Sequence, residues 1–138
     1  MGTIVGIAVG LFASLLGRVA GFDRDRAYYP TLLIVVASYY VLFAAIGNST
    51  HALLVESAVM VVFVAAAVAA FRGPMWIAAA GLVGHGAFDL LLHGHVVANP
   101  GMPVWWPPFC AAFDIAAGLF LAGLLARNDR PHAEPQGR

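Results

Sequence analysis

Residues 52–71 read ALLVESAVMVVFVAAAVAAF, a run of twenty residues in which Glu56 is the only charged side chain. A helix needs about 20 mostly apolar residues to cross the hydrocarbon core of a bilayer. This stretch therefore predicts a membrane-spanning helix, and it raises the question of why a carboxyl group lies inside it.

The composition of the whole chain favours the same class of protein. Of its 138 residues, 62% are hydrophobic and 10% are charged, and the mean hydropathy is +0.86. A typical soluble domain has about 25% charged residues. Seven basic residues balance seven acidic ones, which argues against nucleic acid as a partner and leaves the lipid bilayer as the expected surroundings.

Turn-forming residues divide the chain into five apolar stretches. The predicted fold class is all-α, a polytopic integral membrane bundle of about five transmembrane helices in a single domain, residues 1–127. Residues 128–138 are polar, contain two prolines and are predicted to form a disordered cytoplasmic tail. The predicted spans are Thr3–Ala20, Pro30–Gly47, Ala52–Phe71, Met75–Val97 and Pro108–Ala126.

The basic residues predict the orientation of this bundle. All seven are arginines, and five spans would place all of them on one side of the membrane. Because positively charged segments tend to stay in the cytoplasm, we expect the N-terminus outside and the C-terminus inside the cell. The absence of lysine, together with many alanines and glycines, indicates a bacterial source, and hence a bacterial cytoplasmic (inner) membrane.

A second stretch, GHGAFDLLLHGH at residues 84–95, places several ionisable groups inside the fourth span. His85, Asp89 and His93 are spaced i, i+4, i+8, so on a continuous helix they lie within about 80° of one face. His95 points away from that face and is left out of the predicted site. Glu56 and Asp114, on the third and fifth spans, fall at a depth similar to that of Asp89, so we expect a polar pocket that opens outward.

Such groups are expensive in this setting. An ionised carboxylate at the centre of a membrane costs about 2.5–3.5 kcal/mol on insertion scales. Three hypotheses explain why five ionisable side chains lie there. They fix helix packing through hydrogen bonds, they perform acid–base or metal-assisted chemistry, or they relay protons or cations in a transporter subunit.

The spacing limits which metal or cofactor could bind. His85 and Asp89, or Asp89 and His93, could share a divalent metal ion, whereas His85 and His93 would lie about 12 Å apart on one helix. Haem would need an oligomer, because the deep histidines share one helix. The single cysteine, Cys110, makes a thiolate metal site within one chain improbable.

Acid–base chemistry on a small apolar or lipid-like molecule fits the pattern best, because aromatic residues would wall the pocket. The residues predicted to bind this molecule are Tyr39, Tyr40, Phe88, Trp105 and Trp106. The tryptophan pair is either part of an interfacial aromatic belt or a lid over the site. In kind, such a site resembles that of membrane sterol isomerases, which place a histidine and a carboxylate within a five-helix bundle; the resemblance is chemical and extends to no stretch of sequence.

The first span suggests a contact surface. Gly6 and Gly10 form a small-xxx-small pair, the pattern that lets two helices approach closely in a membrane. We expect either a homo-oligomer through this face or packing against the other helices of the same chain.

Overall fold

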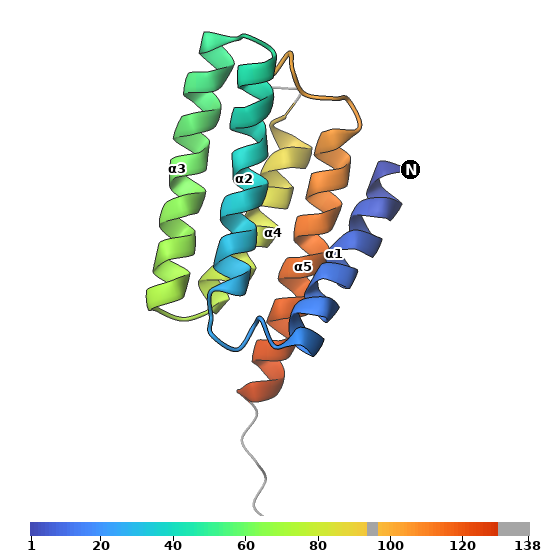
Figure 1. Ribbon diagram of the computed structural model, residues 1–138, viewed down its shortest axis with the longest axis vertical. Helices are drawn as coiled ribbons and strands as arrows, with labels where there is room; N and C mark the ends of the chain where they lie inside the picture. Colours follow the sequence, from blue (N-terminus) through green and yellow to red (C-terminus); the bar gives the residue numbers. More distant parts are fainter. Residues whose placement is uncertain (94–96, 130–138) are drawn as a thin grey trace, which may run out of the picture.

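The computed structural model describes residues 1–93 and 97–129, which form five α-helices and no sheet (Figure 1). All-α is therefore the fold class of the described chain. In chain order the helices are α1 (Gly2–Ala20), α2 (Tyr28–Ile46), α3 (Thr50–Arg72), α4 (Trp76–Leu91) and α5 (Trp106–Asn128).

Four of the five described helices, α1, α2, α3 and α5, are long and apolar enough to cross a membrane. They also leave large hydrophobic side chains exposed, such as Ile4, Phe12 and Leu54. Apolar side chains directed outward are what a helix surface facing lipid requires, because lipid cannot satisfy polar groups.

The fourth span differs from the prediction. The sequence predicted a helix through Val97, but α4 ends at Leu91 and is 16 residues long, or about 24 Å, less than the roughly 30 Å of a hydrocarbon core. The chain turns after Leu92, whose carbonyl accepts a hydrogen bond from the Val97 N–H at 3.2 Å. His93 is consequently not on the helix, and the predicted i, i+4, i+8 stripe has only its first two members on α4.

Glycines set the close approach of the helices. Figure 1 shows α2 and α3 on one side of the bundle and α1 on the other side, against α5. A Cβ atom at Gly6 or Gly10 would lie 2.2 Å from the Phe109 carbonyl oxygen or 2.6 Å from that of Phe113, both on α5. The small-xxx-small face is therefore covered within the chain, so an oligomer that keeps this packing would need another surface.

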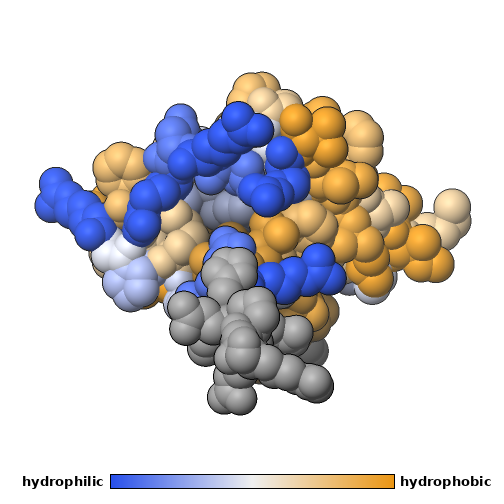
Figure 2. Space-filling view, turned by 90° about the horizontal axis from the view of Figure 1, so that it is seen from below, coloured by the Kyte–Doolittle hydropathy of each residue, from blue (hydrophilic) through white to orange (hydrophobic). Residues whose placement is uncertain are grey.

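The arginines of the described residues gather at one end of the bundle. Figure 2 views the end where α1, α3 and α5 finish and shows hydrophilic side chains together there, with hydrophobic ones beside them. The arginines of the described residues all belong to segments at this end: Arg18, Arg24, Arg26, Arg72 and Arg127. Arg130 and Arg138 lie outside the described residues, as does most of the predicted tail; α5 reaches Asn128, one residue beyond the predicted domain boundary.

Candidate functional site

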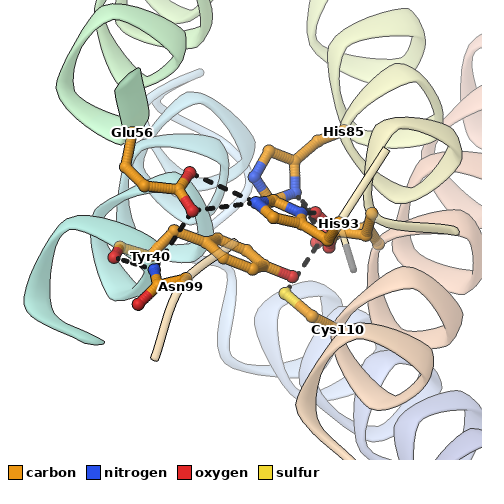
Figure 3. Close-up of polar contacts among 8 residues, drawn as sticks. Tyr40, Glu56, His85, His93, Asn99 and Cys110 are labelled. Atoms are coloured by element: carbon orange, nitrogen blue, oxygen red, sulfur yellow. Dashed lines mark hydrogen bonds and ion pairs between the residues drawn. The ribbon is translucent and has the colours of Figure 1, made fainter. Parts of the chain in front are cut away.

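The structure brings the five predicted site residues together, although they come from three helices and a loop. Their exposed fractions are 1% for Glu56 on α3, 1% and 0% for His85 and Asp89 on α4, 5% for His93 after α4, and 0% for Asp114 on α5. His95 lies outside the described residues. Figure 3 shows the resulting cluster of polar side chains.

His85 lies between two carboxyl groups. Its Nδ1 atom is 2.7 Å from Asp114 Oδ2, a hydrogen-bond distance, and 3.6 Å from Asp89 Oδ2. Asp89 reaches the same histidine because it follows one helical turn later on α4. Asp114 reaches it because Gly86 lets α5 approach: a Cβ atom there would lie 2.8 Å from the Ala111 carbonyl oxygen.

His93 connects Asp89 to the third carboxyl group, that of Glu56. Its Nδ1 atom is 3.1 Å from Asp89 Oδ1, and its Nε2 atom is 3.1 Å from Glu56 Oε1. A neutral imidazole has one N–H donor and one acceptor, and an ionised carboxylate only accepts. With a neutral imidazole and two ionised carboxylates, only one of the two contacts can be a hydrogen bond. For both to be hydrogen bonds, one extra proton must sit on the imidazole or on one of the two carboxyl groups.

Aromatic rings and an amide hold His93 in place. The Tyr40 ring stacks on it with centroids 3.9 Å apart and planes 5° apart, and the Phe88 ring meets it edge-on at 5.0 Å. The Asn99 amide donates to Glu56 Oε1 at 3.1 Å and to the Tyr40 carbonyl oxygen at 2.9 Å. Asn99 thereby holds the Glu56 carboxyl group in place next to His93.

The sequence did not predict Asn99 or Cys110 as site residues. Asn99 lies in a link that contains several prolines and a glycine, where an asparagine more often indicates a turn than a ligand. Cys110 was judged an improbable metal ligand because it is the only cysteine, yet its thiol donates to Asp114 Oδ2 at 3.6 Å. The signal that could have identified it is its i, i+4 spacing from Asp114 on α5, which places both side chains on one face.

Four potential ligand atoms meet at this end of the cluster. One atom each from His85, Asp89, Cys110 and Asp114 lie within 4.8 Å of one another, and all four residues are buried. Asp89 Oδ2, Asp114 Oδ1 and the Tyr40 hydroxyl oxygen have no hydrogen-bond partner within the described residues. Figure 3 shows the hydroxyl end of Tyr40 directed toward the Cys110 sulfur.

The electrostatic balance of the cluster is unfavourable as it stands. Its three carboxyl groups face two imidazoles, and the arginines of the described segments lie at the other end of the bundle. With both imidazoles protonated and all three carboxylates ionised, the net charge is −1. Because an uncompensated charge in a low-dielectric interior is costly, the cluster should take up a further proton or a cation.

A cavity gives access to one side of the cluster. It has a volume of about 780 Å³ and lies between the end of α4, the start of α5 and the link that joins them. Asp89, His93 and Asn99 line it, together with His51 and Ser49 near the start of α3. The cavity is large enough for a small molecule to contact the cluster.

The residues predicted to bind this molecule fall into two groups. Tyr40 and Phe88 flank His93. Tyr39 packs against Trp106 with ring centroids 5.0 Å apart, and Trp105 packs on Trp106 at 5.6 Å. The second group lines other grooves, on the α1 side of α5. Neither group lines the cavity next to Asp89, which Tyr40 and Phe88 approach only through their contacts with His93.

Comparison with known proteins gave no match, whether to a family model, to a curated protein or to a solved structure. The argument on function therefore depends on the geometry of the cluster alone.

Proposed function

We propose that this chain is an integral membrane protein whose buried cluster transfers protons to and from a small apolar or lipid-like molecule. The observation that carries the proposal is the position of His93 between two carboxyl groups, 3.1 Å from Asp89 and 3.1 Å from Glu56, at the wall of a cavity. A general acid or base must lie within hydrogen-bond reach of the proton that it moves, and only a group at the cavity wall can reach a bound molecule.

The roles of the residues follow from their positions. Asp89 and His93 border the cavity, so they are the groups that would exchange a proton with the bound molecule. Glu56 contacts the opposite nitrogen of His93 and would supply or accept the compensating proton. Tyr40 and Phe88 cover the imidazole and exclude water from it, which strengthens each electrostatic interaction inside the site.

The orientation is part of the proposal. The N-terminus lies outside and the C-terminus in the cytoplasm, in a bacterial cytoplasmic membrane, so that the cavity opens outward. The arginines at the far end of the bundle support this orientation through the positive-inside rule.

Cysteine labelling from each side of the membrane tests the orientation. In a Cys110→Ser background, Thr50→Cys should react with an impermeant maleimide added outside intact cells, and Arg127→Cys should react only after permeabilisation, because these exposed residues lie at opposite ends of the bundle. Labelling of both from one side would contradict the topology, and the reversed pattern would contradict the orientation.

Proton or cation transport is the alternative that uses the same groups. A transport path would have to continue from the cluster to the arginine end. The contacts run instead sideways, from Asp114 on α5 to Glu56 on α3, so the geometry favours local proton exchange over translocation. A third alternative, a cluster that only fixes helix packing, predicts no bound molecule.

Deuterium exchange tests the proposed chemistry directly. The purified protein is incubated in D2O with a total bacterial lipid extract, and mass spectrometry follows the molecules retained by the protein. We expect the wild-type protein to retain an apolar molecule and to introduce deuterium at a carbon atom. Asp89→Asn should retain the molecule without labelling it, because the side chain keeps its shape and loses its charge.

His51→Gln is the matched control. His51 lines the same cavity but has no contact with the cluster among those of the described residues, so this variant should still introduce deuterium into the molecule that it retains. Retention of nothing by the wild type, or equal labelling by Asp89→Asn, would contradict the proposed function.

A further inference from the structure

We propose that His85, Asp89, Cys110 and Asp114 bind one divalent transition-metal ion, with Cys110 as a thiolate ligand. This site lies on the α5 side of the cluster and shares Asp89 with the groups proposed to exchange a proton, whereas Glu56, the compensating group, lies on α3. A catalytic role for the ion depends on the proposed function, but binding of the ion does not and can be measured separately.

The distances between the four groups suit a metal ion. Zinc takes nitrogen and oxygen ligands at about 2.0–2.2 Å and sulfur at about 2.3 Å in a tetrahedron, whose edges are then roughly 3.3–3.8 Å. His85 Nδ1 is 3.6 Å from Asp89 Oδ2, and Cys110 Sγ is 3.6 Å from Asp114 Oδ2. The shorter contact of 2.7 Å between His85 and Asp114 would open by less than an ångström as an ion replaced the shared proton.

Buried atoms without partners point to the same place. Asp89 Oδ2 and the Tyr40 hydroxyl are buried and have no hydrogen-bond partner within the described residues. Asp89 Oδ2 faces His85, and the Tyr40 hydroxyl is directed toward Cys110 (Figure 3). A buried polar atom without a partner is destabilising, and coordination of an ion by Asp89 Oδ2 would supply the missing partner.

The charge of the cluster can accommodate a divalent ion. With both imidazoles protonated, the cluster of three carboxylates and two histidines carries a net charge of −1. An ion of charge +2 that replaces the His85 proton and the Cys110 thiol proton leaves this sum at −1, and one further proton on the Glu56–His93 pair brings it to zero without an arginine or lysine. Electroneutrality is what a site in a membrane interior requires.

The ligand types select the class of metal. Magnesium and calcium prefer all-oxygen sites with six or more ligands. One imidazole nitrogen, one thiolate sulfur and two carboxylate oxygens instead suit zinc and neighbouring first-row metals. A catalytic zinc ion has three protein ligands and one open position. The four-ligand site proposed here would reach that state if a substrate oxygen replaced one of the two carboxylates.

Metal content after purification tests the site. The protein, carrying an affinity tag without histidine, is dialysed against micromolar Zn²⁺ and then against buffer, and zinc per chain is measured by elemental analysis. We expect about one zinc per wild-type chain. Asp114→Asn should bind Zn²⁺ at least about tenfold more weakly, because loss of even an outer-shell partner costs about 10–100-fold.

Glu56→Gln is the matched control. It makes the same change of carboxylate to amide in the same buried cluster, but Glu56 contacts His93 and Asn99 and is outside the proposed ligand set. This variant should keep its zinc. Absence of zinc from the wild type, or equal loss of zinc in Asp114→Asn and Glu56→Gln, would overturn the proposal.

Cobalt tests the role of Cys110 without depending on Asp114→Asn folding. Co²⁺ bound to a thiolate gives a sulfur-to-metal charge-transfer band in the near ultraviolet, which Cys110→Ser should abolish. A Co²⁺ complex of the wild type that lacks this band would refute Cys110 as a ligand. Because these readouts measure the metal and the deuterium assay measures proton exchange, each proposal can fail while the other holds.

Discussion

The contact of α4 with α5 at Gly86 offers a way to disturb the cluster without touching a polar residue. In Gly86→Ala, the new Cβ atom would lie 2.8 Å from the Ala111 carbonyl oxygen, 2.9 Å from Ile115 Cγ1 and 3.3 Å from Asp114 Cβ. Non-bonded atoms prefer about 3.5–4.0 Å, so the helices must separate by roughly 0.7 Å or more. Overpacking of this kind costs about 1–3 kcal/mol.

Gly84→Ala is the control, two residues earlier on the same helix. A Cβ atom there meets nothing within 4 Å, so this variant should gain up to about 1 kcal/mol from the higher helix propensity of alanine. Because the gain in helix propensity is common to both variants, we expect their free energies of unfolding to differ by the overpacking cost, about 1–3 kcal/mol, in detergent denaturation. Gly86→Ala should also weaken zinc binding, because it moves Asp114 away from His85. Equal stability of the two variants would refute the close α4–α5 packing on which the site depends.

Three further variants test other parts of the structure. Gly10→Ala should lower the free energy of unfolding by about 1–3 kcal/mol, because the new methyl group pushes α1 away from α5. Gly123→Ala, whose Cβ atom would meet nothing within 4 Å, should not. The same detergent titration measures both variants, and a change only in oligomeric state would argue against the α1–α5 contact. Ser49→Ala should cost about 1 kcal/mol, because the Ser49 hydroxyl accepts from the Ala52 N–H at 3.2 Å, and Ser49→Asn should restore the loss if the side chain acts as a helix cap. Asp89→Asn should stay monodisperse on size exclusion and lose no stability, because it removes a buried charge with an unpartnered oxygen; aggregation would favour a purely structural role.

Much of the fold could be predicted from the sequence, because long apolar helices leave a strong signal in the hydropathy pattern. The apolar length of α3, interrupted only by Glu56, specifies a helix with little help from tertiary contacts. The end of α4 could not be predicted in this way. Residues as far as Val97 are apolar enough to continue the helix, and the turn after Leu92 becomes apparent only once the partners of His93 are placed in space.

The members of the buried cluster were predicted better than its geometry. An ionisable residue in an apolar span is costly, and this signal alone pointed to Glu56 and Asp114. Spacing on one helix indicated that His85 and His93 lie too far apart to bind the same metal ion, and that each could pair with Asp89. Both histidines do contact Asp89, but His93 does so from beyond the end of the helix. Cys110 was discounted because cysteine sites were sought as pairs, although a mixed set of ligands needs only one.

The short α4 and the polar cluster are one feature. A chain that leaves a helix at membrane depth exposes backbone groups that lipid cannot satisfy, so irregular backbone persists there only where protein or a water-filled cavity surrounds it. After Leu91 the chain has such partners: the Leu92 carbonyl bonds to Val97, and His93 and Asn99 bond to Glu56 at the edge of the cavity. A continuous helix would hold His93 two turns from His85 and away from Glu56. The end of the helix at this point therefore places an imidazole between two carboxyl groups, the arrangement on which the proposed proton exchange depends.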